Sequence, residues 1–233
     1  MKALICAAGE GKRLRPYTKD YPKALLKLGD KTLIELMLNN LSECGINEAI
    51  VTVGYKKESI SNTVGNKYKK CIINYVENKD YENTNNMYSL WLAMKMVDDD
   101  VIFFNADIVF DIDILKDVIE SEHANAVAIS EKIKQDSMMV VIENGFVKQF
   151  GKFLSEDVAG DSIGIYKLSQ DACKRYSEIA SRLINQGHRN ASFVNPLNEL
   201  IDQFRIKAIY TRNRKHAEID TLEDYEYAQR LFS

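Results

Sequence analysis

The sequence predicts a single α/β domain with a mixed, mainly parallel central sheet flanked by helices. In the first half, short apolar runs alternate with segments whose apolar residues recur at helical spacing, giving the order β-α-β-α-β-α-β. In the second half, short apolar runs are separated by turns, and no linker rich in Pro, Gly or Ser divides the two halves. We therefore expect one domain over residues 1–233, with residues 1–125 and 126–233 as its halves.

The elements of the first half follow from where each apolar pattern stops. The apolar run at residues 2–8 ends at Gly9, as a buried parallel strand does. Apolar residues from Leu33 to Leu41 recur at helical spacing and stop at Gly45, which predicts a helix. By the same reasoning we expect strands at 49–53, 72–76 and 101–105 and helices at 59–66 and 86–97. Such an order predicts right-handed crossovers between parallel strands.

The second half mixes strands and helices in a less regular order. We expect strands at 126–130, 138–142, 145–150, 162–167 and 206–210 and helices at 194–203 and 221–232. These elements are expected to complete the sheet and to cover its functional face.

Composition excludes several classes of protein. Lys and Arg number 31 and Asp and Glu 34, a net charge of -3, whereas nucleic-acid binders show a basic excess on their binding face. No apolar run approaches 18 residues, and the first residues turn polar too soon for a signal peptide, so we expect neither a membrane partner nor export.

The cysteines and histidines do not have the spacing of a zinc site. The four cysteines are scattered, none within a C-x-x-C spacing, and the three histidines lie far from them in sequence. Unpaired cysteines suit a reducing compartment, so we expect a cytoplasmic protein.

The loop at residues 9–23 is the most informative stretch of the chain. It follows the first strand directly, and ligands in open α/β sheets bind beyond the carboxyl ends of strands. Gly9 and Gly11 let the backbone approach a ligand closely, while Arg13 and Lys23 supply cations suited to a polyphosphate. The loop holds two of the three prolines. It is neither a dinucleotide fingerprint nor a P-loop, and a plain surface loop is the alternative.

This loop and three later segments together resemble the signature of the sugar-nucleotide pyrophosphorylase-type nucleotidyltransferases. The matching segments are Gly9-x-Gly11-x-Arg13-Leu14-x-Pro16-x-Thr18-x-x-x-Pro22-Lys23, Val53-Gly54-Tyr55, Asn105-Ala106-Asp107 and Glu218-Ile219-Asp220-Thr221-x-x-Asp224-Tyr225. The resemblance extends over nearly the whole chain. It implies a Rossmann-like nucleotidyltransferase fold of the GT-A-like type, an NTP in the N-terminal half, and Mg²⁺ as cofactor between Asp107 and Asp220.

The implied roles agree with the charge requirements of nucleotidyl transfer. Two phosphate groups must be brought together, so the work is mainly charge neutralisation and alignment. Mg²⁺ favours carboxylates together with phosphate oxygens and water. Lys23 is expected to stabilise charge on the α-phosphate and the leaving pyrophosphate, and Arg13 to hold the β- and γ-phosphates. The alternatives are a strand-end turn residue for Asp107 and a helix N-cap for Asp220, a role for which Thr221 competes.

The segment that opens the third helix points to the nucleotide. Residues 85–90 resemble the Asn-Asn-x-Tyr-Ser-Leu segment of small cytidylyltransferases that act on phosphocholine or 2-aminoethylphosphonate. The resemblance implies CTP, with Asn86 and Ser89 near the cytidine. Backbone from Ala7, Ala8, Gly9, Gly11 and Gly54 completes the expected nucleotide site. The alternative role for these asparagines is helix capping.

The acceptor site is expected in the second half of the chain. Lys152 resembles a lysine that meets the acceptor phosphate in this subgroup, and Gly164 lets a ligand approach a strand. Asn195 lies where phosphocholine enzymes carry acidic and aromatic groups, and it departs from that pattern. A quaternary ammonium favours an aromatic cage. The subgroup also includes capsule-modifying enzymes that activate phosphoglutamine, and a small phosphorylated acceptor of that polar kind is expected here.

Three other functions remain open at this point. One is transfer from UTP or dTTP to a hexose-1-phosphate, another is a non-catalytic nucleotide-binding regulatory module, and a third is a glycosyltransferase using a nucleotide sugar. The asparagine segment opposes the first, the joint presence of Arg13, Lys23, Asp107 and Asp220 opposes the second, and the Pro22-Lys23 end of the loop opposes the third. Whether the chain is a monomer or a homodimer is left open.

Overall fold

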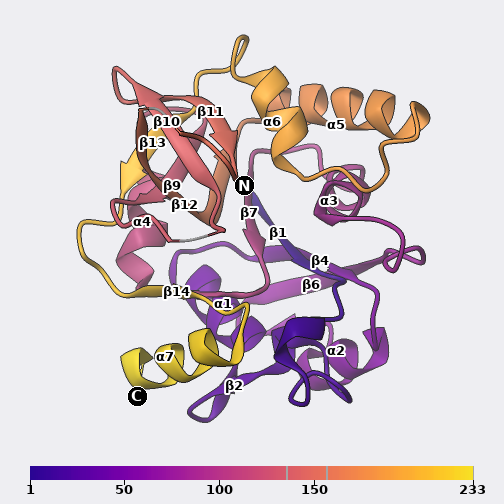
Figure 1. Ribbon diagram of the computed structural model, residues 1–233. Coiled ribbons are helices and arrows are strands. Elements are labelled where there is room, and N and C mark those ends of the chain that lie inside the picture. The colour runs from indigo at the N-terminus through magenta and orange to yellow at the C-terminus, as the bar shows by residue number, and fades with distance from the viewer. Residues whose placement is uncertain (135, 156, 233) are drawn as a thin grey trace.

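The computed structural model describes residues 1–134, 136–155 and 157–232. Within them, ten strands form one sheet in the order β10-β11-β13-β9-β12-β7-β1-β4-β6-β5, and helices flank it (Figure 1). A continuous sheet joins the two halves of the sequence because β12, from the second half, pairs with β7, from the first. The predicted single α/β domain with a mixed sheet is confirmed.

The helices and strands are as follows. The strands are β1 (Lys2–Ala7), β2 (Lys27–Leu28), β3 (Lys31–Thr32), β4 (Glu48–Val53), β5 (Lys67–Tyr68), β6 (Cys71–Glu77), β7 (Val101–Asn105), β8 (Ile108–Phe110), β9 (Ala126–Ser130), β10 (Met139–Glu143), β11 (Phe146–Gly151), β12 (Val158–Leu168), β13 (Lys207–Tyr210) and β14 (His216–Glu218). The α-helices are α1 (Leu33–Glu43), α2 (Lys57–Val64), α3 (Asn86–Met94), α4 (Ile112–Glu120), α5 (Gln170–Asn185), α6 (Val194–Leu200) and α7 (Leu222–Phe232). Two 3-10 turns, η1 (Lys12–Leu14) and η2 (Lys23–Leu25), lie in the loop after β1.

Four neighbouring strands, β6, β4, β1 and β7, form the parallel part of the sheet. In its register Ile5 lies between Val51 of β4 and Phe104 of β7. Parallel strands point their carboxyl ends to one edge, so the residues that follow Ala7, Val53 and Asn105 are brought together. This edge carries the loop at residues 9–23.

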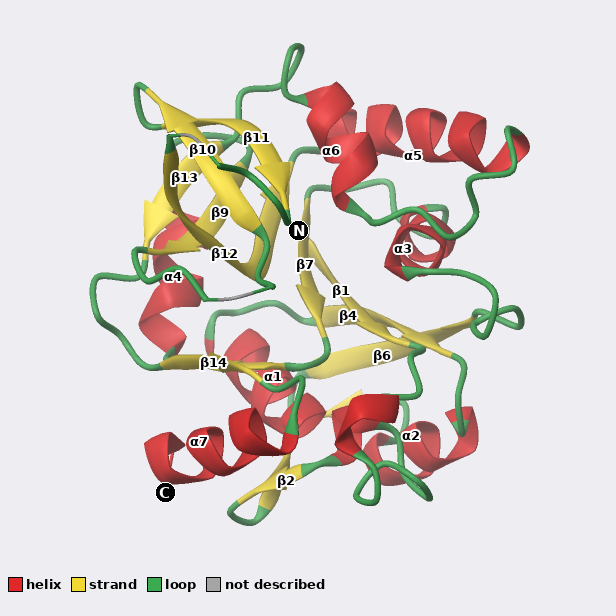
Figure 2. Cartoon of the chain, in the orientation of Figure 1, coloured by secondary structure: helices red, strands yellow, loops and turns green. Residues whose placement is uncertain are grey.

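The second half is more antiparallel than the sequence suggested. Strand β12 pairs antiparallel with β7, β9 and β10, and β13 with β9 is the parallel pair there. Because β10 also pairs with β11, these strands curl into a partly closed layer (Figure 2). The expectation of a mainly parallel sheet thus holds for the first half only, since short turns such as that at Asn144–Gly145 join antiparallel neighbours.

Two hydrophobic layers cover the two faces of the sheet. One contains α1, α2 and α4, packed on residues such as Ile5 and Val51. The other contains α3, α5 and α6, packed on residues such as Leu4 and Phe103. Alternate residues of β1 therefore enter different layers, which explains why the strand is a continuous apolar run. A third cluster packs α7 on the loop after β1 through Leu14 and Tyr225.

Two helices were not predicted from the sequence. Helix α5 is the longest described, with Ser169 as its N-cap and buried Ala172, Tyr176 and Ile179 at helical spacing. Helix α4 buries Ile114, Leu115 and Val118 in the same way.

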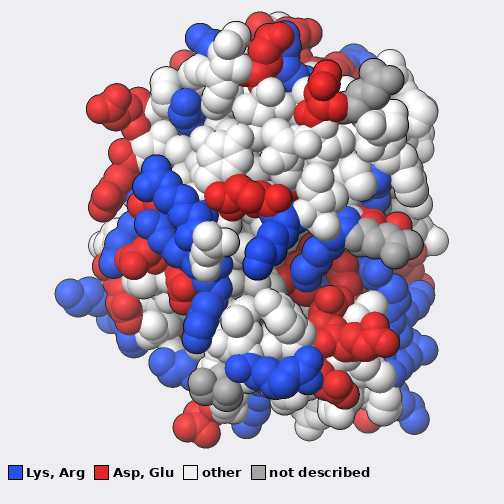
Figure 3. Space-filling view, turned by 60° about the vertical axis from the view of Figure 1, so that its left-hand side comes forward, with Lys and Arg blue, Asp and Glu red and all other residues white. Residues whose placement is uncertain are grey.

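Among the described residues, none of the helices combines the length and the apolar character that crossing a bilayer requires. On the face shown in Figure 3, basic and acidic side chains are interspersed.

Candidate functional site

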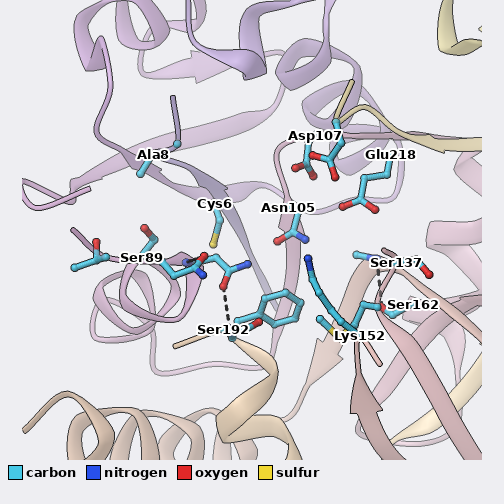
Figure 4. A pocket seen from close by; sticks show the side chains of 18 of the residues that line it. Cys6, Ala8, Ser89, Asn105, Asp107, Ser137, Lys152, Ser162, Ser192 and Glu218 are labelled. Atoms are coloured by element: carbon cyan, nitrogen blue, oxygen red, sulfur yellow. Dashed lines mark hydrogen bonds between the residues drawn. The ribbon is translucent and has the colours of Figure 1, made fainter. Parts of the chain in front are cut away.

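A cleft opens at the carboxyl edge of the parallel strands. Two adjoining cavities of about 350 Å³ and 390 Å³ make it up, and both are lined by Arg13, Asp107 and Asp220. The two cavities therefore share a charged centre. From it the 390 Å³ cavity extends along the loop after β1 to Lys23, and the 350 Å³ cavity extends to the start of α3 at one end and to residues of the second half at the other. Figure 4 shows side chains that line the 350 Å³ cavity.

The loop after β1 folds so that Lys23 faces this centre. Gly11 has a φ of 64°, a left-handed conformation that suits glycine, and a β-carbon there would lie 3.1 Å from Cβ of Lys23. The buried Thr18 hydroxyl donates to the Gly11 carbonyl at 2.7 Å. The loop is therefore held by its own residues close to the cleft.

Three carboxylates meet opposite Lys23. Strand β14 pairs antiparallel with β8, and the Ile219 N–H donates to the Asp107 carbonyl at 2.8 Å. This pairing brings Asp107 beside Glu218 and Asp220, and one oxygen from each carboxylate lies within 4.8 Å of the others. The backbone of β8 and β14 thus determines the cluster.

Lys23 and Arg13 neutralise part of this negative charge. The Lys23 ammonium donates to Asp107 Oδ2 at 2.9 Å and to Asp220 Oδ1 at 2.7 Å, and Arg13 pairs with the same Asp220 oxygen at 2.9 Å. Burial alone would lower the pKa of Lys23, but the two carboxylates outweigh it and raise that pKa. For Asp220, burial acts to raise the pKa, and Lys23 with Arg13 lowers it overall.

Glu218 differs from the two aspartates. Burial, together with the charges of Asp107 and Asp220, raises the pKa of Glu218 to about 8. No ammonium or guanidinium group among the described residues forms an ion pair with Glu218 at contact distance, although Lys23 and Lys134 act on it from further away. At neutral pH the two aspartates are therefore balanced by Lys23 and Arg13, and Glu218 adds a third carboxylate that ionises only at higher pH or beside an added positive charge.

These residues fit a divalent cation. Carboxylate oxygens are the ligands that Mg²⁺ prefers, and Asp107 Oδ1 is buried without a hydrogen-bond partner among the described residues. The helix-cap alternative for Asp220 is not needed, because the Thr221 hydroxyl accepts from the Asp224 N–H at 3.2 Å at the start of α7. Asp220 is thus free to face the cleft.

One end of the cleft is lined by amides and hydroxyls. The buried Asn78 follows β6 and donates to Thr84 Oγ1 at 2.9 Å and to Ser89 Oγ at 3.1 Å. Asn85 is the N-cap of α3, its side chain accepting from the Asn86 N–H. The capping alternative therefore applies to Asn85, and the side chain of Asn86 lines the cavity, with its Oδ1 accepting from the Phe193 N–H.

The other end is lined by residues of the second half. Lys152 extends toward Asn105 in Figure 4, with Ser162 and Glu218 nearby. Gly164 has a φ of 86° at the bulge in β12, and a β-carbon there would lie 3.5 Å from Asn105 Nδ2. This end combines a cation with hydroxyl groups.

Two aromatic side chains of the cleft, Tyr166 and Phe193, are packed in the core. The Tyr166 ring stacks on Phe103 with centroids 4.5 Å apart and meets the edge of Phe193. The Tyr166 hydroxyl is engaged by Ser162. The half-buried Trp91 packs toward α5, its Nε1 donating to Ser181 at 2.7 Å, and does not line the cleft.

Most of the expected site residues line the cleft, and two do not. Those in it are Ala7, Ala8, Gly9, Gly11, Arg13, Lys23, Asn86, Ser89, Asp107, Lys152, Gly164 and Asp220. Gly54 lies beside the cleft, where a β-carbon would come within 2.8 Å of the Ala8 carbonyl and 2.9 Å of Tyr81 Cβ. Asn195 is exposed on α6, whereas its neighbours Ser192 and Phe193 line the cleft.

Sequence reasoning did not single out Glu218, Asn78 or Phe193 as lining the site. A signal for Glu218 was present, since it stands two residues before Asp220 and ends a short strand. Asn78 directly follows β6, and Asp107 comes two residues after the end of β7, so the strand-end rule that found Asp107 could also have found Asn78. Phe193 carried no comparable signal.

Comparison with known proteins agrees with this geometry. The chain is 27% identical to the CTP:phosphoglutamine cytidylyltransferase of Campylobacter jejuni over 97% of this chain and 98% of that one. It is 46% identical to the choline-phosphate cytidylyltransferase of Streptococcus pneumoniae, but over only 40% of this chain and 39% of that one. Its fold matches that of a putative glucose-1-phosphate thymidylyltransferase from Bacillus anthracis with a TM-score of 0.85 at 18% identity, covering 99% and 94% of the two chains. The nucleotidyl transferase family model matches residues 2–152, and the chain belongs to that family.

Proposed function

We propose that the chain transfers CMP from CTP to the phosphate of a small non-sugar acceptor and releases pyrophosphate. The observation that carries the proposal is the charged centre of the cleft, where Lys23, Arg13 and two aspartates meet. The amide-rich end suits a nucleobase, and the end with Lys152 suits a second phosphate. Both ends open onto the same centre, as a transfer between two phosphates requires.

The reaction proposed is a displacement at phosphorus. An oxygen of the acceptor phosphate attacks the α-phosphorus of CTP, the α–β anhydride bond breaks, and pyrophosphate leaves with the bonding electrons. Lys23 and Arg13 compensate the charge that builds on the α-phosphate and on pyrophosphate. Lys152 holds the acceptor phosphate.

We propose Mg²⁺ as the cofactor. Asp107 and Asp220 would hold it, with Glu218 beside them. When bound, Mg²⁺ supplies positive charge that lets the two anionic substrates approach each other. The unpartnered Asp107 Oδ1 supports a ligand at this position.

The proposed acceptor is small, polar and phosphorylated, like phosphoglutamine. Tyr166 is buried with one ring face stacked on Phe103, which opposes its use in a cage for a quaternary ammonium group, the feature that phosphocholine would need. The similarity to the Campylobacter jejuni enzyme over nearly the whole chain supports the same choice. We further propose that the protein acts in the cytoplasm, which its free thiols suit, and that its product serves cell-surface polysaccharide synthesis, which rests on the resemblance alone.

Pyrophosphate release tests the proposal. The protein with Mg²⁺ is assayed with CTP, UTP, dTTP, ATP and GTP, each against phosphoglutamine, phosphocholine, 2-aminoethylphosphonate and hexose-1-phosphates. We expect release with CTP and one non-sugar acceptor. Release only with UTP or dTTP and a sugar phosphate would replace the proposal by a sugar nucleotidyltransferase, and nucleotide binding without release with any acceptor would favour the regulatory module.

A further inference from the structure

The hydrogen bonds of Asn86 determine which of its polar atoms can reach a ligand. Asn86 is the first residue of α3, and its Oδ1 accepts from the backbone N–H of Phe193 at 2.9 Å. A backbone N–H only donates, so it accepts no bond from the amide nitrogen. The two hydrogens on Nδ2 donate to no described residue, and the side chain lines the cleft. Asn86 therefore presents donors, and no acceptor, to a bound ligand.

The partner of this hydrogen bond is itself held in place. Phe193 is 4% exposed, and its ring packs edge-on against Phe103 and Tyr166 at 5.8 Å and 5.3 Å. The neighbouring Arg189 is tied to the segment before α3, pairing with Asp80 at 2.8 Å. The Phe193 N–H thus has a fixed position relative to α3, and so does the amide it orients.

Ser89, one turn further along α3, presents a donor as well. Its Oγ accepts from the Asn78 amide at 3.1 Å, which leaves the hydroxyl hydrogen available to a ligand. Asn78 is oriented in turn, because its Oδ1 accepts from the Asp80 N–H at 3.1 Å. Two side chains at this end of the cleft are therefore arranged to donate. In Figure 4, Ser89 lies on the far side of the cavity from Glu218.

A donor pair of this kind distinguishes pyrimidines. Cytosine offers two neighbouring acceptors, O2 and N3, whereas uracil and thymine carry a hydrogen on N3 that would face another donor. Donors left without a partner in a confined site are costly, so the wrong base is rejected more strongly than by shape alone. We infer that Asn86, oriented by the Phe193 N–H, is a specificity-determining residue that selects cytosine over uracil and thymine. This inference rests on the proposed function and names the residue that sets its nucleotide preference.

The test is Asn86→Asp, with Asn85→Asp as the matched control. A carboxylate at position 86 still accepts from Phe193, but it presents an acceptor where the amide presented donors. Asn85 is the exposed N-cap of α3 at the border of the same cavity, and its Oδ1 is used by the Asn86 N–H. Aspartate caps a helix as well as asparagine does. Both variants add one negative charge at adjacent positions, so a general repulsion of nucleotides affects CTP and UTP alike. The ratio of the two affinities isolates base recognition.

The readout is binding of CTP and of UTP by titration calorimetry with Mg²⁺, together with the melting temperature of each variant. We expect the wild type to prefer CTP and Asn86→Asp to lower the CTP-to-UTP affinity ratio by roughly 100-fold, with Asn85→Asp unchanged. A second variant, Asn86→Ala, should weaken CTP binding and bring the CTP-to-UTP affinity ratio toward one. It replaces Asn86→Asp in the test if the aspartate variant does not fold. An unchanged ratio in a folded Asn86 variant overturns the inference. A wild type that prefers UTP overturns the proposed function itself, which is a different result.

Discussion

Replacing Lys23 by Met removes the ammonium that bridges the two expected metal ligands. Its Nζ lies 2.9 Å from Asp107 Oδ2 and 2.7 Å from Asp220 Oδ1, and the side chain is 14% exposed. A divalent cation that binds the same oxygens must displace this ammonium. In the wild type, cation binding without nucleotide is therefore opposed by the loss of two charge-assisted hydrogen bonds.

The size of the effect follows from those two bonds. Each contributes about 1.5–3 kcal/mol, so they oppose the cation by roughly 3–6 kcal/mol before the released ammonium regains its hydration. The hydration of the released ammonium offsets part of this penalty of roughly 3–6 kcal/mol. Arg13 keeps its positive charge in the variant and still opposes the cation, so the net gain in Mn²⁺ binding is smaller than the two bonds alone suggest. We expect Lys23→Met to bind Mn²⁺ at least about tenfold more tightly without nucleotide, a difference of about 1.4 kcal/mol. Turnover should fall by roughly 100-fold or more, because the charge on the leaving pyrophosphate loses its partner.

The assay measures free Mn²⁺ by electron paramagnetic resonance in a titration without nucleotide. Lys12→Met is the control, since Lys12 belongs to the same loop but is 67% exposed and pairs with Glu10. Without cation, Lys23→Met should also have a lower melting temperature than the wild type, because three carboxylates lose a neighbouring positive charge. Added Mn²⁺ should restore the melting temperature. Equal or weaker Mn²⁺ binding by the Met variant, with the protein folded, refutes the reasoning.

Other predictions concern packing, the acceptor and a thiol. Gly54→Ala should lower the free energy of unfolding by about 1–3 kcal/mol, measured by urea denaturation, because its β-carbon would lie 2.8 Å from the Ala8 carbonyl. Lys152→Ala should raise the acceptor KM by roughly 10-fold or more and leave the KM for CTP unchanged, whereas Lys148→Ala, an exposed lysine of β11, should change neither. Burial, with a smaller effect of Asp107, raises the pKa of Cys6 from 9.0 to about 12, so the folded state favours the thiol. That stabilisation is complete below pH 9 and is lost as the pH rises from 9 to 12. At pH 8, peptide mapping should therefore find Cys6 unmodified by iodoacetamide in the folded protein, and modification at the rate of an unfolded control contradicts this.

Much of the first half could be predicted because its strands are buried on both faces. Such a strand is a continuous apolar run ending at a glycine or polar residue, as at Gly9 and Asn105, and its boundaries are visible in sequence. Helix α5 was missed although Ser169 caps it and its buried residues are regularly spaced. It is polar over most of its surface, and its apolar stripe becomes clear only when α3 and α6 are seen against it.

Resemblance and strand-end position together predicted the centre of the cleft. Lys23 meets Asp107 and Asp220 across 84 and 197 residues of sequence, and all three were expected at the site. Two features could not be read from residue types. The approach of Glu218 to Asp107 depends on the pairing of β14 with β8, and the orientation of Asn86 depends on a backbone N–H that lies 107 residues away.

The most direct test of the account is the fate of each phosphate of CTP. CTP labelled with ³²P at either the α- or the γ-phosphate is incubated with the protein, Mg²⁺ and phosphoglutamine, and the products are separated by chromatography. CMP transfer predicts that the α-label appears in a new product containing the acceptor, and the γ-label in pyrophosphate. Appearance of the γ-label in the acceptor product, or hydrolysis of CTP with no labelled acceptor product from any member of the acceptor panel, would contradict CMP transfer.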